Sequence, residues 1–289
     1  MKTAEHLVPE LSVIMANYNG GDLISDAIES ILNQTYRNFE FIIIDDGSAD
    51  NSMDIIQKFQ KNDERIKLIQ NEKNCGLPKS LNNGIKAAKG QYIARQDSDD
   101  LSALDRFEKQ IPYMKEHNLD LCGSGTKYIS ENGYQLACDK GPSREEFKDY
   151  LFSQRAIFPH GSAIFTKKSI EALEGYNEDF FYTQDMELWL RFLEKGYRVD
   201  KLDEPLYSFR IQKENASEAK IQGQNRYTKY LKEFYSDQPI TFNLKEINQM
   251  VNFLRKDKKK KNSLQIELKY FESLLKYKIK KWIKYNNYF

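Results

Sequence analysis

The chain has 289 residues, a length that allows one large α/β domain or a core domain with an appendage. Hydrophobic residues make up 40% and charged residues 30% of it, which is ordinary for a globular protein with a real core. We expect no signal peptide and no membrane span, because the start lacks an apolar segment and no apolar run approaches the roughly 18 residues required. Cys75, Cys122 and Cys138 are odd in number and lack metal-type spacing, so we expect reduced thiols in a cytoplasmic protein.

The net charge of +1 hides an asymmetry between the two ends of the chain. Residues 255–289 contain twelve Lys or Arg and three acidic residues, which gives about +9 and leaves about −8 for the rest. A globular acidic body with a basic, aromatic tail is therefore expected.

The first half of the chain alternates between predicted strands and helices. Apolar runs predict strands at 11–19, 39–46, 65–74, 91–100 and 120–129. Helical spacing of apolar residues predicts helices at 22–34, 52–62, 77–90 and 103–118, with Gly90 as the stop of the third. This rhythm predicts an α/β fold, with a right-handed and mostly parallel sheet that is flanked by helices.

The alternation weakens after about residue 126. Residues 128–137 predict a hairpin that turns at Asn132-Gly133. A short helix at 143–153, a strand at 161–167 and an amphipathic helix at 185–196 follow, and almost everything beyond residue 216 is typical of helix.

Two predicted strands end in aspartates. The stretch FIIIDDGSADNS, at 41–52, runs from four apolar residues into Asp45 and Asp46. In open α/β sheets ligands bind outside the carboxyl ends of the strands, so these carboxylates predict a binding site. A strand end with helix-capping residues would have the same sequence, and this alternative stays open.

The second strand end carries Asp97, Ser98, Asp99 and Asp100. Two carboxylates separated by one small residue can present oxygens to one divalent ion, and Mg²⁺ and Mn²⁺ prefer carboxylate, water and phosphate oxygens. The alternative is a solvated loop that caps the helix at Ala103.

Four stretches in this order carry a resemblance to a known family. LSVIMANYN, AIESILNQTYRNFEFIIIDDGSADNS, NCGLPKSLNNGIKAAKGQYIARQDSDD and QDMELWLRF together resemble the family 2 glycosyltransferases, which have the GT-A fold, and in particular bacterial surface-polysaccharide enzymes. The resemblance covers roughly residues 10 to 215. It implies a GT-A catalytic domain at 1–215 and a helical C-terminal extension at 216–289.

The resemblance also implies roles for single residues on the nucleotide side. Ala16 and Tyr18 would line the nucleotide pocket, with Tyr18 stacked on the base; a half-buried tyrosine at a strand end is the alternative. Asp46 would hold the nucleoside, while Asp45 would only orient it. Lys79 would neutralise a donor phosphate, and a solvated lysine is the alternative; Asn82 would support the site.

At the reacting end, Asp97 and Asp99 match the metal-binding Asp-x-Asp of the family, with Mn²⁺ or Mg²⁺ as the cofactor. Asp97 and Ser98 would also face the donor. Asp185 matches the aspartate that deprotonates the acceptor hydroxyl, and a helix cap is its alternative role.

On the acceptor side, the resemblance implies weaker assignments to Asp100, His160 and Gln184. Gln184 stands where the family often has Glu. Trp189 is expected in the core, and Gln212 replaces a histidine that serves as a third metal ligand in some members.

The tail of residues 255–289 interleaves lysines with aromatic residues. A basic amphipathic helix there would suit an anionic membrane surface, whereas a helix packed on the body is the alternative. Nucleic-acid binding is not expected, because the body is acidic and no recognition motif is present.

The sequence therefore predicts a cytoplasmic enzyme, peripheral at the inner face of the cell membrane. The expected activity is inverting transfer of a hexosyl or N-acetylhexosaminyl group from a nucleotide-sugar donor, a UDP-sugar by preference, to a glycan that is lipid-linked. Alternatives are a metal-dependent nucleotidyltransferase and a catalytically silent nucleotide-sugar-binding scaffold.

Overall fold

The computed structural model describes residues 8–152, 156–180 and 183–212. The extension expected from residue 216, including the basic tail at 255–289, lies outside these residues. No helix within the described ranges has the length and apolarity that crossing a bilayer requires.

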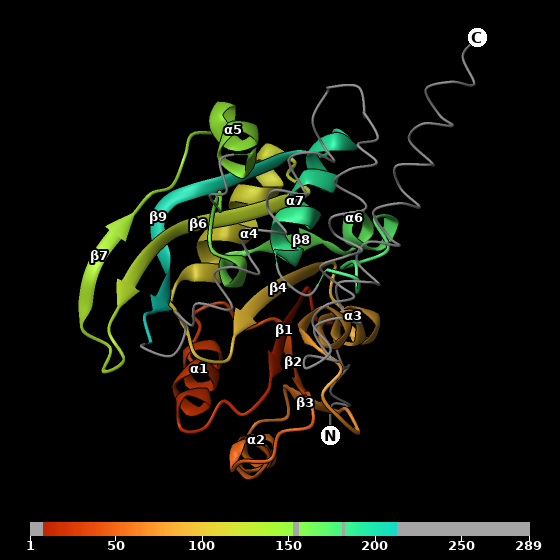
Figure 1. Cartoon of the computed structure of the whole chain (residues 1–289), viewed down its shortest axis with the longest axis vertical. Coiled ribbons are helices and arrows are strands. Elements are labelled where there is room, and N and C mark those ends of the chain that lie inside the picture. Colours follow the sequence, from red (N-terminus) through yellow and green to blue (C-terminus); the bar gives the residue numbers. More distant parts are fainter. Residues whose placement is uncertain (1–7, 153–155, 181–182, 213–289) are drawn as a thin grey trace, which may run out of the picture.

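One sheet forms the centre of the molecule (Figure 1). Its strands are β1 (Leu11–Asn17), β2 (Phe39–Asp45), β3 (Ile66–Gln70), β4 (Tyr92–Asp97), β5 (Leu101–Ser102), β6 (Leu121–Ile129), β7 (Gln135–Asp139), β8 (Ile164–Thr166) and β9 (Val199–Arg210). The α-helices are α1 (Leu23–Leu32), α2 (Ser52–Asn62), α3 (Leu77–Ala87), α4 (Arg106–His117), α5 (Phe147–Phe152), α6 (Lys167–Ala172) and α7 (Gln184–Glu194). Two 3₁₀ turns, at Arg144–Glu146 and His160–Ser162, complete the described elements.

The strand order is β3-β2-β1-β4-β8-β6-β9-β5, and β7 pairs with β6. The strands β3, β2, β1 and β4 pair in parallel and form what we call the parallel half. From β8 onward the pairings are mostly antiparallel, except for β6 with β9; these strands and β7 form the mixed half. In Figure 1 the parallel half lies below and the mixed half above, and β4 is the strand of the parallel half that borders the mixed half.

The strands of the parallel half are buried on both faces, as their continuous apolar runs predict. All seven residues of β2 are buried. Ile14 of β1 packs into a core with Leu81 of α3, whereas Val13 packs on the other face with Ile28 of α1. Helices on both faces and a sheet that begins with parallel strands confirm the expected fold class.

Several local expectations are confirmed and two are corrected. Asn132-Gly133 does turn the β6–β7 hairpin, with Gly133 at φ +81°, and the cysteines are free thiols. Gly90 is not the helix stop, because α3 ends at Ala87 and a Cβ on Gly90 would lie 2.6 Å from the backbone of β1. The long strand β9 was not expected.

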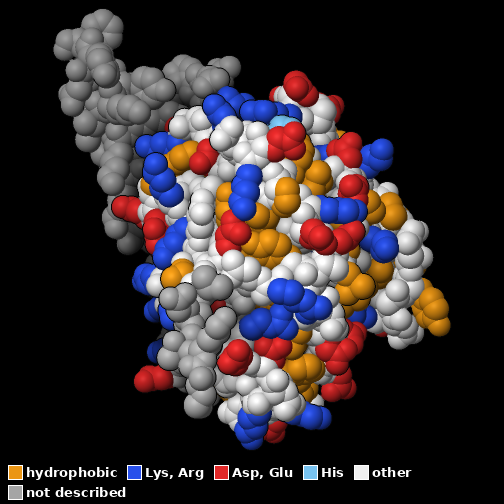
Figure 2. Space-filling model, turned by 180° about the vertical axis from the view of Figure 1, so that it is seen from behind, with side chains coloured by type: hydrophobic (Ala, Val, Ile, Leu, Met, Phe, Trp, Pro, Cys, Tyr) orange, Lys and Arg blue, Asp and Glu red, His pale blue; other side chains and the backbone are white. Residues whose placement is uncertain are grey.

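The face in Figure 2 shows acidic and basic side chains interspersed.

Candidate active site

The carboxyl ends of β1 and β2 are joined through Asp45. Asn17 lies opposite Asp45 in the register of the two strands, and its Nδ2 donates to Asp45 Oδ1 over 3.1 Å. Ser48 Oγ donates to the same oxygen over 2.6 Å, and Ser48 N donates to Oδ2 over 3.0 Å. Asp45 is fully buried, so its carboxylate serves to fix the turn that presents Asp46.

Asp46 holds the loop that leads into α3. Its Oδ1 accepts hydrogen bonds from Cys75 N (2.9 Å), Cys75 Sγ (3.0 Å) and Asn71 Nδ2 (2.8 Å), and its Oδ2 accepts one from Gly76 N (2.9 Å). Burial raises the pKa of Asp46, but the bonds from Cys75 and Asn71 outweigh it, so the pKa lies below its ordinary value. Because a carboxylate oxygen can accept two bonds, Oδ2 keeps acceptor capacity for a ligand N–H.

Tyr18 projects from the same rim. The backbone N–H of Asp46 donates to Asn17 O over 2.8 Å, which places Asp46 beside the residue that precedes Tyr18. Tyr18 is 51% exposed, so its ring is accessible for stacking. Ala16 is half-buried at the end of β1, and Lys79 is exposed in the first turn of α3.

Asp97 ends β4, the strand next to β1, and faces Ala16 in the register. It pairs with Arg95, whose Nη2 lies 2.6 Å from Asp97 Oδ1 and whose side chain is fully buried. Nε and Nη1 of Arg95 have no hydrogen-bond partner among the described residues. Burial alone would lower the pKa of Arg95, but the charge of Asp97 raises it, so Arg95 remains a cation.

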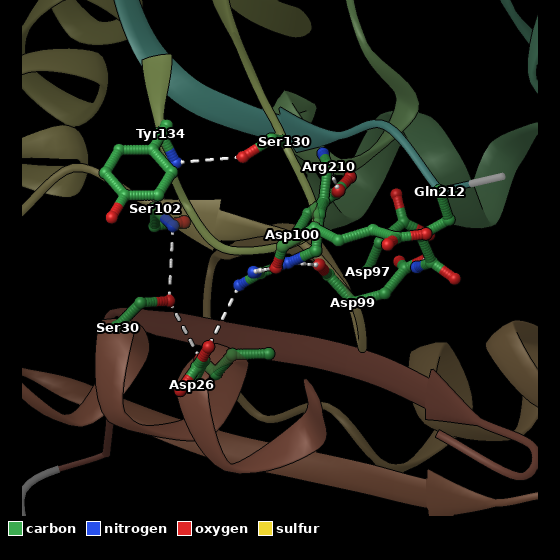
Figure 3. A network of polar contacts seen from close by, with 12 residues as sticks. Asp26, Ser30, Asp97, Asp99, Asp100, Ser102, Ser130, Tyr134, Arg210 and Gln212 are labelled. Carbon is green, nitrogen blue, oxygen red and sulfur yellow. Dashed lines mark hydrogen bonds and ion pairs between the residues drawn. The ribbon is translucent and has the colours of Figure 1, made fainter. Parts of the chain in front are cut away.

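Asp99 is held from the end of β9 (Figure 3). Gln212 Nε2 donates to Asp99 Oδ2 over 2.8 Å, and Arg210 Nε donates to the backbone oxygen of Asp99 over 2.9 Å. Arg210 Nη2 also pairs with Asp26 of α1 over 2.9 Å. The loop that carries Asp99 is therefore tied both to β9 and to α1, and Ser98 is half-buried within it.

Asp100 lies beneath this loop. It is 1% exposed, and its two oxygens accept hydrogen bonds from Arg210 N (2.7 Å) and the Tyr207 hydroxyl (2.9 Å). Burial, together with the charges of Asp97 and Asp99, raises its pKa well above the ordinary value. Both Asp100 oxygens are thus bonded to β9, and the acceptor contact expected of Asp100 stays a prediction.

The carboxylates of this loop can bind a cation only through oxygen atoms. The carboxylates of Asp97 and Asp99 are hard ligands, and Gln212 turns its amide nitrogen, not its oxygen, toward Asp99. Over the described ranges, no three His, Cys, Asp or Glu side chains are grouped to enclose a metal. The residues thus fit a Mg²⁺- or Mn²⁺-type ion whose remaining positions are taken by water or phosphate.

Asp185 lies in the first turn of α7 and is half-buried. It lines a cavity of about 260 Å³ together with Asp97 and His160. Burial raises the pKa of Asp185, and the charge of Asp97 raises it further. A carboxylate with a raised pKa beside a cavity is what a general base requires. Gln184, half-buried, is the residue before it.

His160 is fixed by Tyr176, whose hydroxyl is 2.7 Å from His160 Nε2. Burial lowers the pKa of His160 well below its ordinary value, and the charge of Arg95 contributes, so the ring is neutral. Asn82 of α3 binds the backbone of Tyr176 through both amide atoms, at 2.8 and 2.9 Å, which agrees with a supporting role. Trp189 is fully buried in the core, as expected.

Two residues of the site were not expected from the sequence. Arg95 could have been noticed as an arginine inside an otherwise apolar strand that ends at Asp97. Tyr207 of β9 gave no such signal, although its hydroxyl lies within 3.2 Å of both Asp97 Oδ2 and Asp97 N.

The chain is similar to proteins of known family. The O-antigen biosynthesis glycosyltransferase WbnJ of Escherichia coli is 33% identical over 236 residues, which cover 80% of this chain and 91% of WbnJ. The UDP-Gal:alpha-D-GlcNAc-diphosphoundecaprenol beta-1,3-galactosyltransferase of the same species is 31% identical over 212 residues, covering 72% and 76%.

A solved structure has the same fold. The mannosyltransferase PcManGT of Pyrobaculum calidifontis, in complex with GDP-Man and Mn²⁺, matches with a TM-score of 0.63 at 16% identity, over 94% of this chain and 86% of that one. The family model described as glycosyl transferase family 2 matches residues 12–173. The chain is a glycosyltransferase, and it belongs to family 2.

Proposed function

We propose that the protein transfers a hexosyl or N-acetylhexosaminyl group from a UDP-sugar to a hydroxyl of a lipid-linked glycan, with inversion, in surface polysaccharide biosynthesis. The observation that carries this proposal is that Asp97, at the end of β4, and Asp185, at the start of α7, line one cavity. The E. coli galactosyltransferase is named for a UDP-sugar donor and a diphosphoundecaprenol-linked acceptor, which supports this choice of substrates.

The donor would lie across the ends of β1, β2 and β4. Tyr18 would stack on the base, Asp46 Oδ2 would accept a base N–H, and Ala16 and Ser98 would line the pocket. Lys79, in the first turn of α3, would attract the diphosphate. The rim is built for an anion there, because the N-terminus of α3 and the lysine both favour negative charge.

Asp99 and Asp97 would hold a Mn²⁺ or Mg²⁺ ion. When bound, such an ion neutralises negative charge on the departing diphosphate. Arg95 keeps Asp97 in place by its ion pair, and Gln212 does the same for Asp99 by its hydrogen bond.

Asp185 would take the proton of the acceptor hydroxyl as its oxygen attacks the anomeric carbon of the donor. The new glycosidic bond forms on one face while the bond to the diphosphate oxygen breaks on the other, so a single displacement inverts the configuration. The products are the extended glycan, UDP and a protonated Asp185, which returns its proton to water.

The test is release of nucleoside diphosphate from UDP-, GDP- and TDP-sugars, with Mn²⁺ and with chelator. We expect release from one UDP-sugar that is abolished by chelator and by Asp99→Ala. Asp105→Ala, which changes a half-buried aspartate that pairs with Lys109 outside the site, should leave release unchanged. Release of pyrophosphate would instead identify a nucleotidyltransferase. Absence of both release and metal-dependent UDP binding would overturn the proposal.

We further propose that residues 255–289 bring the enzyme to the cytoplasmic face of the membrane. The support is their composition, about +9 with interleaved aromatic residues. Deletion of residues 255–289 is expected to abolish binding to vesicles that contain anionic lipid, measured by co-sedimentation. Absence of vesicle binding by the full chain would refute it.

A further inference from the structure

The cavity beside Asp97 and Asp185 extends away from the nucleotide side. Apart from these two residues, its walls come from β6, β7, β9, the 139–141 turn and residues 156–160. Among the described residues, none from β1, β2 or α3 lines it. Since β4 stands between β1 and the mixed half in the sheet, the cavity opens on the far side of Asp97 from Tyr18 and Asp46.

One face of β6 supplies much of the wall. Ser124, Thr126 and Tyr128 are two residues apart and therefore point to the same side of the strand. Tyr128 pairs in register with Phe209 of β9, and the two rings meet edge to face with centroids 6.1 Å apart. Phe209 is 39% exposed, although it is an aromatic residue of a strand that pairs with β6.

This combination of surfaces suits a sugar ring. A pocket with apolar and aromatic walls and a few convergent polar groups is the usual form of a small-molecule site. The C–H face of a sugar can pack on Tyr128 and Phe209, while the hydroxyls of Ser124 and Thr126 and the Lys140 ammonium can bond to its hydroxyl groups. A volume of about 260 Å³ is below the usual range for larger ligands, so one sugar unit is the appropriate occupant.

The charges around the cavity argue against an acidic sugar. Its lining contains three carboxylates, those of Asp97, Asp139 and Asp185, against the single ammonium of Lys140. The other titratable groups are neutral: burial lowers the pKa of His160 and raises the pKa of Tyr128. The charge of Asp97 is offset by its ion pair with Arg95. A uronate would therefore meet the carboxylates of Asp139 and Asp185 against one ammonium, which is unfavourable at short range.

We propose that this cavity binds one uncharged sugar unit of the acceptor, with Tyr128 and Phe209 as its aromatic wall and its reacting hydroxyl at Asp185. The inference rests on the proposed function, because the acceptor hydroxyl must reach the base from the side that the donor leaves open. It assigns acceptor recognition to the β6–β7 hairpin and β9.

The test measures binding of methyl glycosides of glucose, galactose, N-acetylglucosamine and glucuronic acid by saturation-transfer NMR. We expect at least one neutral glycoside to bind the wild-type protein. The same glycoside should bind Phe209→Ala about tenfold more weakly and Tyr134→Ala as tightly as the wild type. Tyr134 is the matched control, since it is an aromatic residue of the same hairpin that is 74% exposed and does not line the cavity. If Phe209→Ala does not fold, Lys140→Gln replaces it, with a weaker but measurable loss.

Several results would overturn the inference: no glycoside binds, the glucuronide binds best, or Phe209→Ala and Lys140→Gln bind as the wild type does. UDP binding, measured by calorimetry, separates this failure from that of the proposed function. UDP binding with no Phe209-dependent glycoside binding refutes only the cavity assignment. Phe209-dependent glycoside binding without UDP binding refutes only the proposed donor chemistry.

Discussion

Replacement of Arg95 by Met separates a functional role of this buried cation from a structural one. Met keeps an unbranched apolar stem and removes only the guanidinium. The change breaks the ion pair with Asp97, and removing one partner of a buried pair costs about 3–5 kcal/mol. Asp97 is 29% exposed and can be hydrated, so we expect the lower end of that range.

The same replacement also removes a destabilising contribution to the free energy of unfolding. Nε and Nη1 of Arg95 are buried without a partner among the described residues, and an unsatisfied buried group costs about 1–3 kcal/mol. The two effects nearly cancel, so we expect the free energy of unfolding to change by less than about 2 kcal/mol. That corresponds to a change in Tm of at most roughly 4–8 °C.

Activity is expected to respond quite differently. Without Arg95 the Asp97 carboxylate keeps the Tyr207 hydroxyl, at 3.2 Å, but loses the ion pair that fixes its other oxygen. A misplacement of about 1 Å can reduce a rate about 100-fold. We therefore expect kcat for sugar transfer to fall about 100-fold in Arg95→Met, with part of the loss recovered in Arg95→Lys. Steady-state kinetics and thermal melts on the same preparations measure both quantities.

Arg65→Met is the matched control, because Arg65 forms an ion pair of 2.7 Å with Asp63 away from the site. It is expected to leave kcat unchanged. The reasoning is refuted if Arg95→Met keeps its activity within about threefold, or if its Tm falls by much more than 8 °C, since the arginine would then be structural.

Three further variants address the base, the loop before α3 and the loop of Asp99. Asp185→Asn is expected to lower kcat about 10²–10⁴-fold. Because the ionised form of Asp185 is the proposed base and its pKa is raised, wild-type activity should already decline above pH 3.8 as the pH falls; a decline that begins only at or below pH 3.8 would contradict this. Asp46→Ala leaves loop donors unpaired, so we expect a loss of about 2–4 kcal/mol in urea unfolding and weaker UDP binding by calorimetry, and unchanged values for both would refute it. Arg210→Ala is expected to lower the free energy of unfolding in urea by about 2–3 kcal/mol, whereas Asp26→Ala, which removes a partner whose side chain is 55% exposed, lowers it by less than about 1 kcal/mol. Equal losses would show that the ion pair, and not the contacts of Arg210 with backbone oxygens, stabilises the fold.

The parallel half was predictable from the sequence because its strands are buried on both faces. A run such as Phe41–Ile44 has no other stable place in a globular protein, and its hydrophobic pattern does not depend on distant contacts. The same reasoning placed Asp46 and Asp97 at strand ends on one edge of the sheet.

The mixed half was less predictable, and β9 is the clearest case. Its sequence, VDKLDEPLYSFR, contains four charged residues before Tyr207 and a proline, which weaken any strand pattern. The strand exists because it pairs with β6 and with β5, contacts that no local pattern reveals. Since the strand that carries Tyr207 and Arg210 was not predicted, the burial of Asp100 against it could not be foreseen either.

The change from parallel to mixed pairing at β4 also has an evolutionary consequence. Crossover helices connect the parallel strands and pack into the cores on both faces of the sheet, so an insertion within one of them would disturb that packing. The β6–β7 hairpin, in contrast, turns at Gly133, where a Cβ would meet nothing within 4 Å. Related enzymes that share the parallel half could therefore diversify by exchanging this hairpin. Chimeras that swap the hairpin between relatives should leave the parallel half intact.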